Sequence, residues 1–412
     1  MDPISILKGK RIVLGVTGSI AVYKAVDLAS KLTQAGALVD VVMTAAAREF
    51  VMPLAFQAVT GRVVYTDLWH AESGDGLPTH IAHVGLGEGA DLFAIIPATA
   101  NTLAKLAAGL ADDLISVTAL ANRAPLMVAP AMDGGMYSHE ATQANIATLL
   151  SRRVTLIEPE IGRMASGLEG RGRLPETSQL MGEIRRALGK SGALKGRRVV
   201  VTAGGTQEPI DPVRYITNRS SGKQGYAIAQ AAVDAGAEVV LISTVDLPIP
   251  VGVQLQPVRS ADDMLRVTLA QAALSDALIM AAAVADFTPE VVAEHKIKKQ
   301  DGQSGLALEL KRTADILGEI SAHKQEQPRV TVGFAAESQD LLDNAQSKLM
   351  RKGLDFIVAN DISAADAGFA VDDNRVVVLT RAGERVEYPL QSKTAVAEMI
   401  VGRVAGLLAA QG

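Results

Sequence analysis

Four side chains that can hold and activate an anion gather in residues 211–225, DPVRYITNRSSGKQG. The segment follows an apolar run (199–201) that ends at two glycines, and it leads into a helix-like stretch, GYAIAQAAVDAGAEV. Strand, glycine turn, polar loop and helix is the order in which α/β proteins place N–H groups and hydroxyls around a phosphate. The loop is more elaborate than a minimal dinucleotide turn, which indicates an anion that is held and acted on. Its candidate residues are Asn218, Ser220, Ser221 and Lys223.

The first half of the chain has its own polar strand ends. They are the segments TGSIAVYK (17–24), Thr44 with the two alanines after it, PATANTLAK (97–105) and PAMDGGMYSH (130–139). We expect these loops to meet, because open α/β sheets bind ligands just past the carboxyl ends of their strands. The TGS turn suits a phosphate. Thr99 and Asn101 could hydrogen-bond a heterocycle or cap a helix, and capping is the commoner role for Thr99.

His80 and His83, in THIAHV, lie in a region of the first half that is otherwise polar and rich in glycine. His80 could be a general base or a clamp for an acidic group, since the pKa of histidine lies near neutrality. The alternative is an ordinary exposed loop histidine. A metal site is disfavoured, because the two histidines lack a carboxylate–cysteine set at ligand spacing.

One pattern of elements occurs twice. Two regions follow the order strand, turn, helix, Ala-Gly, strand. The first is RIVLGVTGSIAVYKAVDLASKLTQAGALVDVVMT near the start of the chain, and the second is the region from 197 to 244. This predicts an α/β protein with two doubly wound Rossmann-like domains. One long sheet is the alternative. A charged helix followed by Gly189, Ser191 and Gly192 predicts the boundary, with domains at 1–190 and 195–412.

Composition narrows the class of protein. The chain has 412 residues, net charge −5, 3% aromatics and no cysteine. These values disfavour nucleic-acid binding and rule out disulfides, thiolate nucleophiles and Cys-ligated zinc. No apolar run approaches the ~20 residues that span a membrane, and the N-terminus lacks the order of a signal peptide. We therefore expect a soluble cytoplasmic protein.

The motifs of the first half, TGSIAVYK, HIAHV, PATANTLAKLAAGLADDL and PAM-x-x-x-MY-x-x-x-AT, resemble flavin-dependent cysteine decarboxylases of coenzyme A biosynthesis. The second half resembles phosphopantothenate–cysteine ligase, so the whole chain is similar to the bifunctional decarboxylase/ligase family of bacteria. The resemblance implies that FMN accepts and returns electrons while a cysteinyl substrate loses CO₂. His80 lies at the family's catalytic histidine. The implied FMN-binding residues are Gly18, Ser19, Thr44, Thr99 and Asn101.

Two positions depart from that family pattern. Asp133 stands where the family has asparagine, and Ser166, in ASGLEGRGR, stands where the family's flap has the cysteine that acts as an acid. A serine hydroxyl is a far weaker acid than a thiol. The half could have lost decarboxylation and remained a scaffold beside an active ligase. It could use another proton donor, or Asp133 could be protonated and replace both functions. We favour an active variant, because the FMN loops, His80 and the glycine-rich flap are retained.

In the second half the resemblance implies ligation of cysteine to 4′-phosphopantothenate through an acyl-cytidylate, with CTP and Mg²⁺. Asn218 would support amine attack or organise its own turn. Asp286 could contact the ribose or base of the nucleotide, or it could hold Mg²⁺. Three of the implied residues also have an ordinary structural explanation: Lys296 could be a solvated surface lysine, Phe334 a core residue, and Asp315 a helix cap. The ligands of Mg²⁺ stay open. The nucleotide-binding residues implied are Met280, Ala281, Ala282, Asp286, Lys296, Ala314, Asp315, Ile316, Leu317, Phe334, Lys348 and Lys352.

The resemblance also implies that the chain forms a homo-oligomer, and it disfavours two other functions. Flavin domains of this type resemble trimers with FMN at a subunit contact, and the ligase half resembles a dimer, so a dodecamer would satisfy both symmetries. Prenyl transfer to FMN is disfavoured, because fusion to a ligase joins consecutive steps. A non-enzymatic nucleotide sensor is disfavoured too, because Asn218 and the lysines exceed what binding requires.

Overall fold

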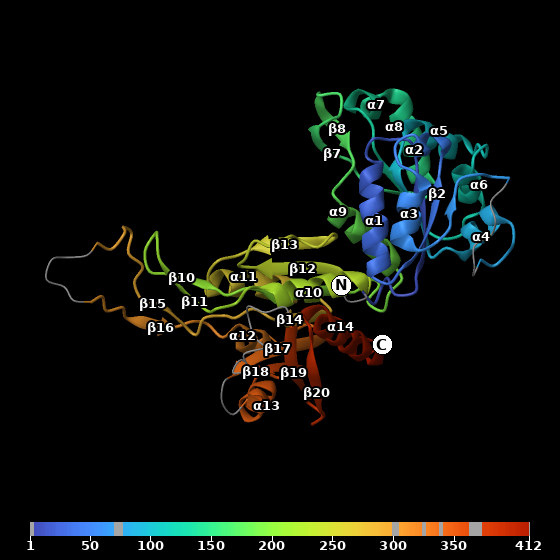
Figure 1. Cartoon of the computed structure of the whole chain (residues 1–412). Helices are drawn as coiled ribbons and strands as arrows, with labels where there is room; N and C mark the ends of the chain where they lie inside the picture. Colours follow the sequence, from blue (N-terminus) through green and yellow to red (C-terminus); the bar gives the residue numbers. More distant parts are fainter. Residues whose placement is uncertain are drawn as a thin grey trace. The chain divides into compact units, whose positions relative to one another are not determined.

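A computed structural model describes residues 4–69, 77–298, 305–323, 327–337, 341–361 and 373–411. The chain forms two compact units, residues 1–188 and residues 189–412 (Figure 1). Each unit is built on its own sheet, so the alternative of one long sheet is wrong. The predicted α/β class with two doubly wound domains is confirmed.

The sheet of unit 1 has six parallel strands in the order β3-β2-β1-β4-β5-β6. The strand order reverses between β1 and β4, and such a reversal marks the crevice where doubly wound sheets bind ligands. The strands are β1 (Arg11–Val16), β2 (Leu38–Met43), β3 (Val64–Tyr65), β4 (Leu92–Ala98), β5 (Leu126–Pro130) and β6 (Thr155–Leu156).

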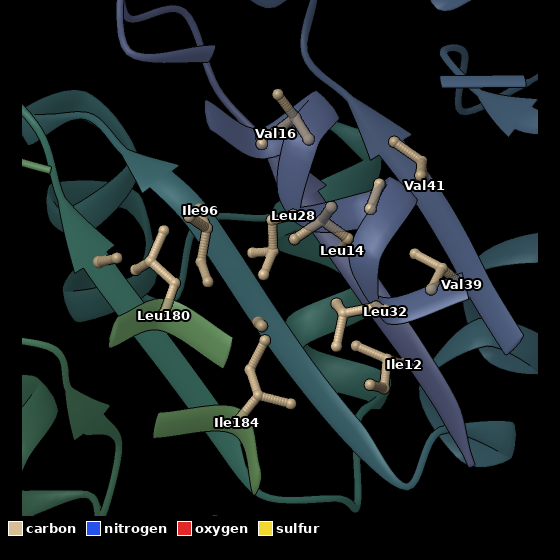
Figure 2. Packing of buried hydrophobic residues seen from close by; sticks show 14 of the residues in the cluster. Ile12, Leu14, Val16, Leu28, Leu32, Val39, Val41, Ile96, Leu180 and Ile184 are labelled. Atoms are coloured by element: carbon tan, nitrogen blue, oxygen red, sulfur yellow. The ribbon is translucent and has the colours of Figure 1, made fainter. Parts of the chain in front are cut away.

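Apolar clusters cover both faces of this sheet. Side chains alternate along β1, so Ile12, Leu14 and Val16 pack with one cluster and Val13 packs with the other. Figure 2 shows the first cluster, in which α1 contributes Leu28 and Leu32, and Leu180 and Ile184 come from α9. Burial on both faces explains why these strands are continuous apolar runs.

The helices of unit 1 connect and cover these strands. They are α1 (Val22–Gln34), α2 (Ala45–Arg48), α3 (Pro53–Thr60), α4 (Ala82–Gly89), α5 (Ala100–Ala108), α6 (Leu114–Ala121), α7 (Gly134–Ser138), α8 (Glu140–Ser151) and α9 (Thr177–Gly189). Between α8 and α9 the chain forms a separate antiparallel hairpin of β7 (Glu160–Arg163) and β8 (Glu169–Arg173). This hairpin carries the glycine-rich flap sequence.

The sheet of unit 2 has eight strands in the order β13-β12-β9-β14-β17-β18-β19-β20. The first six are parallel, and β19 and β20 add an antiparallel edge. The strands are β9 (Arg198–Ala203), β12 (Glu238–Ser243), β13 (Val253–Pro257), β14 (Ala277–Met280), β17 (Val330–Glu337), β18 (Phe356–Asp361), β19 (Asp373–Thr380) and β20 (Arg385–Ser392).

Helices again cover both faces. Apolar side chains of α10 (Lys223–Asp234) and α14 (Lys393–Ala410) pack on one face, and those of α11 (Ala261–Ala272), α12 (Ile316–Ala322) and α13 (Leu341–Arg351) pack on the other. Two short ribbons lie beyond the sheet: β10 (Gln207–Pro209) with β11 (Tyr215–Thr217), and β15 (Phe287–Pro289) with β16 (Leu310–Arg312). No helix among the described residues is long and apolar enough to cross a membrane.

Candidate functional site

In unit 1, the loops after β1, β4 and β5 are joined by hydrogen bonds at the carboxyl edge of the sheet. The buried hydroxyl of Thr17 donates to the carbonyl of Pro97 (2.7 Å) and accepts the N–H of Thr99 (3.0 Å). The N–H of Ala131 donates to the carbonyl of Ala98 (3.1 Å). Three of the four predicted loops therefore lie side by side at the switch point.

The turn after β1 lies too close to α2 to carry a side chain at Gly18. A Cβ on Gly18 would lie 2.5 Å from the Cβ of Ala46 in α2, so only glycine allows this approach. Within the described structure, the N–H groups of Gly18 and Ile20 have no acceptor. The Ser19 hydroxyl accepts the N–H of Ala21 (3.3 Å). Free N–H groups beside a hydroxyl at the start of α1 suit a phosphate.

Two of the predicted cofactor residues cap helices at this edge. The Thr44 hydroxyl accepts the N–H of Ala47 (3.2 Å), and the Thr99 hydroxyl accepts the N–H of Thr102 (3.3 Å). The capping role considered for Thr99 is thus present, and its hydroxyl also shares a hydrogen bond with the Thr102 hydroxyl (3.1 Å). Asn101 lies exposed in the first turn of α5.

His80 is exposed two residues before α4, whereas His83 lies half-buried inside that helix. Residues 70–76, which lie shortly before His80 in the chain, are outside the described residues. The placement of His80 therefore leaves its catalytic role a prediction.

The two departures from the family pattern touch each other. The Ser166 hydroxyl donates to Oδ2 of Asp133 (2.6 Å), and Oδ1 of Asp133 accepts the N–H of Gly135 (3.1 Å) at the start of α7. The hydrogen bond from Ser166, and then that from Gly135, lower the pKa of the Asp133 carboxyl below its ordinary value. Both hydrogen bonds favour the ionised form of Asp133, and the alternative in which it is protonated stays a prediction that titration would decide.

The β7–β8 hairpin is seated on the loop after β5. The N–H of Met132 donates to the carbonyl of Gly172 (3.1 Å), and a Cβ on Gly172 would lie 2.2 Å from the carbonyl oxygen of Met132. A Cβ on Gly134 would lie 3.2 Å from the Cα of Gly170. Close backbone packing therefore requires glycine at position 172 of the flap, whereas Gly167 is favoured by its left-handed φ of 86°.

A buried lysine, which sequence reasoning did not single out, holds the base of the hairpin. Lys24 of α1 donates to the carbonyls of Leu174 (2.8 Å) and Pro175 (3.4 Å) and to the carboxylate of Glu176 (3.0 Å). Its side chain is 6% exposed. The helix that starts at the phosphate-type turn therefore also fixes the chain just after the flap.

A Lys24→Met variant is expected to lower the free energy of unfolding of unit 1 by about 2 kcal/mol, since hydrogen bonds to a charged group are lost without a change in length. Lys31→Met on the same helix is the control. Lys31 makes only an exposed pair with Asp27, so its loss should cost less than about 0.5 kcal/mol. Urea unfolding of each variant, monitored by hydrogen exchange in peptides from residues 11–43, measures the free energy of unfolding of unit 1. Equal effects in the two variants would contradict an anchoring role for Lys24.

In unit 2, Asn218 joins its own loop to the loop after β14. Its amide nitrogen donates to the carbonyls of Val284 (3.1 Å) and Ala283 (3.4 Å). The carbonyl of Asn218 accepts the N–H of Ser220 (2.8 Å), and a Cβ on Gly205 would lie 2.6 Å from that same carbonyl oxygen. The side chain of Asn218 thus fixes a neighbouring loop, while its backbone forms the turn.

Eight of the twelve predicted nucleotide residues lie in two connected stretches, 280–286 and 314–317. Thr313 joins them, because its N–H donates to the carbonyl of Asp286 (3.0 Å) and its hydroxyl donates to that of Ala285 (2.6 Å). The N–H of Ala282 donates to the Thr202 hydroxyl at 3.1 Å. The carboxylate of Asp286 is exposed and has no partner among the described residues.

Several predicted contacts can come only from the backbone. The side chains of Met280, Ile316 and Leu317 lie in the core, with exposures of 5%, 3% and 7%. Ala281 and Ala314 lie in the same loops and have no polar side chain. These positions can offer a nucleotide only N–H and C=O groups and short apolar contacts.

Asp315 performs the capping role that the sequence analysis left open. Its carboxylate accepts the N–H of Gly318 (3.1 Å) at the start of α12 and forms an ion pair with Lys352. Burial lowers the pKa of Lys352. Helix α13 ends at Arg351, so Lys352 lies just beyond the end of that helix.

Lys348 and Phe334 are also brought together. The ammonium group of Lys348 donates to the carbonyl of Phe334 (2.8 Å), whose partly buried ring packs against the core. The core interpretation of Phe334 is therefore satisfied. Two of the three lysines predicted to bind the nucleotide, Lys348 and Lys352, thus have acceptors within unit 2.

Sequence reasoning also missed a carboxylate that fixes the lysine segment. The buried carboxylate of Asp211 accepts the N–H groups of Val213 (2.8 Å), Arg214 (2.9 Å) and Ile297 (3.1 Å). The Arg214 guanidinium holds the pKa of Asp211 well below its usual range and donates to the carbonyl of Ile297 (2.8 Å). Both backbone groups of Ile297 are therefore held, and this positions its exposed neighbour Lys296. The DPVR sequence was the available signal, because an aspartate that starts a turn often binds nearby N–H groups.

No metal centre is preassembled in the described part of the chain, which has no group of three or more His, Asp or Glu side chains that could hold an ion. Magnesium commonly binds through one or two carboxylates together with substrate phosphates. The identity of its ligands stays a prediction.

Comparison with known families covers nearly the whole chain. The Flavoprotein family model matches residues 5–189. The model of the DNA/pantothenate metabolism flavoprotein C-terminal domain matches residues 194–408. The two matches follow the order that the motifs predicted.

Relatives match over the same length. The chain is 48% identical to the coenzyme A biosynthesis bifunctional protein CoaBC of Bacillus subtilis, over 97% of this chain and 98% of that protein. It is 44% identical to CoaBC of Vibrio cholerae, over 96% of this chain and 98% of that protein. The solved C-terminal domain of a CoaBC shares 40% identity (TM-score 0.45; 53% of this chain, 98% of that chain). The solved structure of the FMN-dependent cysteine decarboxylase SpaF shares 34% sequence identity (TM-score 0.38; 44% of this chain, 97% of that chain). The chain belongs to the family of coenzyme A biosynthesis bifunctional proteins, CoaBC.

Proposed function

We propose that this chain catalyses two consecutive steps of coenzyme A biosynthesis. Unit 2 ligates cysteine to 4′-phosphopantothenate with CTP through an acyl-cytidylate, and unit 1 decarboxylates phosphopantothenoylcysteine to 4′-phosphopantetheine with FMN. The observation that carries the proposal is 48% identity to a bifunctional relative over 97% of the chain. The polar loops at both switch points agree with it.

The residues of unit 1 fit FMN. The free N–H groups of Gly18 and Ile20, with the Ser19 hydroxyl, suit its phosphate. Thr44 and Asn101 lie in the adjoining loops and would hydrogen-bond the rest of the cofactor. When bound, FMN supplies the electron acceptor and donor for the loss of CO₂. His80 would hold or move a proton on the cysteinyl substrate.

The residues of unit 2 fit a nucleoside triphosphate and an activated carboxylate. Lys296, held in place through Ile297, supplies a cation for the phosphates, and the free carboxylate of Asp286 can contact the nucleotide or Mg²⁺. Asn218 presents an amide beside the loop 280–286. Positioned cations and donors of this kind stabilise the charge that develops during attack on the α-phosphate.

We also propose that the protein is cytoplasmic, because its proposed substrates are small intracellular metabolites. We propose further that it is a homo-oligomer, because its flavin half resembles domains that form trimers and its ligase half resembles domains that form dimers. Size-exclusion chromatography with light scattering tests the assembly. A multiple of three subunits supports it, and a monomer contradicts it.

One incubation tests the function. Purified full-length protein is supplied with 4′-phosphopantothenate, cysteine, CTP and Mg²⁺, and the products are read by mass spectrometry. We expect 4′-phosphopantetheine and CMP, with no product when CTP is omitted. If the reaction stops at phosphopantothenoylcysteine, the ligase proposal stands and the decarboxylase proposal fails. If no amide forms at all, the ligase proposal fails as well.

A further inference from the structure

The two residues that depart from the family pattern form a single contact, although 33 positions separate them in the chain. Asp133 lies at the start of α7, and Ser166 lies at the tip of the β7–β8 hairpin. The family pair, asparagine and cysteine, could not make the same bond, because a thiol is a weak donor and an amide carries no charge. The two departures therefore have one physical explanation between them.

The direction of this bond argues against proton donation by Ser166. Its hydroxyl hydrogen points to an ionised carboxylate at 2.6 Å. A negative charge beside a hydroxyl disfavours loss of its proton, so the neighbour makes an already weak acid weaker. Ser166 thus lacks the acidity with which the family's cysteine donates a proton.

The bond instead completes the docking of the hairpin. Lys24 fixes the base of the hairpin through Leu174, Pro175 and Glu176, and the Met132–Gly172 hydrogen bond fixes its second strand. Within the tip, the N–H of Met164 donates to the carbonyl of Leu168 (2.8 Å), which closes the turn. The Ser166–Asp133 bond ties this closed turn to α7.

We propose that Asp133 and Ser166 form a latch that holds the β7–β8 hairpin closed on α7, with Ser166 acting as a positioning residue and not as the proton donor. The role of the closed hairpin in decarboxylation rests on the proposed function, but the latch itself does not. The latch is a property of this chain's own residue pair. It explains why both positions differ from the family together.

Hydrogen exchange of the full chain tests the latch without any assay of activity. We expect Ser166→Ala and Asp133→Asn each to speed amide exchange in peptides covering 164–170 by about fivefold, as for loss of the Ser166–Asp133 bond. Ser166→Ala also removes the long hydrogen bond that the Leu168 N–H donates to the Ser166 hydroxyl (3.5 Å), so Asp133→Asn is the variant that isolates the latch. The double variant should exchange no faster than the faster single variant, because both changes break the same bond. Ser138→Ala is the matched control, since its hydroxyl donates within α7 to Gly134 (2.9 Å) and not to the hairpin. Unchanged exchange, or additive effects in the double variant, would overturn the latch.

Product formation separates positioning from proton donation. For a positioning residue, Ser166→Ala should slow formation of 4′-phosphopantetheine from phosphopantothenoylcysteine only about fivefold, whereas loss of a general acid costs about 10²-fold or more. Ser166→Thr, which keeps the hydroxyl, should restore most of the rate. Asp133→Asn with Ser166→Cys, the family pair, should be faster than either single change. A loss above 10²-fold in Ser166→Ala with unchanged exchange would make Ser166 the acid. If the native chain makes no product, the function fails and the exchange cycle still decides on the latch.

Discussion

An Asn218→Ala variant is expected to lose amide-bond formation between 4′-phosphopantothenate and cysteine by about 10²–10³-fold, the usual cost of removing one positioned donor. We expect CTP-dependent formation of the acyl-cytidylate to persist. The reason is that the lysines and Asp286 are proposed to act on the nucleotide, whereas the Asn218 amide would act on the intermediate or on the entering amine. Quenched-flow mass spectrometry with and without cysteine resolves the two steps.

The structure adds a competing outcome to this experiment. The Asn218 amide holds the carbonyls of Ala283 and Val284, which lie within the loop 280–286 that would contact the nucleotide. If the acyl-cytidylate and the amide disappear to the same extent, Asn218 is a positioning residue for that loop and not a participant in the second step. Thr217→Ala is the matched control, because Thr217 is the exposed neighbour that donates to the Asn218 carbonyl at 3.3 Å. Full coupling in Asn218→Ala would remove Asn218 from the mechanism.

A His80→Asn variant is expected to lower release of CO₂ from phosphopantothenoylcysteine by about 10²–10⁴-fold, the range attributed to one acid–base group. Asparagine keeps a hydrogen-bond donor and acceptor of similar size but cannot take up a proton near neutral pH. Release of labelled CO₂ measures the effect. Ligation should be unchanged, because the ligase residues lie in the other unit.

His83→Asn provides the comparison for this variant. His83 is three residues further on, lies half-buried in α4, and is given no part in the chemistry. We expect it to retain CO₂ release within a few-fold and to bind the same amount of flavin. Unchanged release in His80→Asn, or equal losses in the two variants, would make His80 structural.

The sequence by itself determined the two sheets and the places of the loops. Buried parallel strands read as apolar runs, and glycine turns before amphipathic helices recur at a spacing that local geometry enforces. The runs at 11–16 and 198–203 became the central strands β1 and β9, with the polar turns at their carboxyl ends. Such features depend on residues a few positions apart, so they could be predicted without the fold. The antiparallel edge formed by β19 and β20 was not predicted, because strand direction at an edge depends on the path of the connecting chain.

Only the tertiary structure decided which side chains meet. Lys24 lies 150 residues from the Leu174 carbonyl that it binds, Asp211 lies 86 residues from Ile297, and Asp133 lies 33 residues from Ser166. No periodicity records such pairs, because a hydrogen bond between distant residues needs the strand order, the loop paths and the rotamers all at once. The sequence could name Asp133 and Ser166 as unusual one at a time. The fold made them a single contact, since it brings the tip of one hairpin onto the start of one short helix.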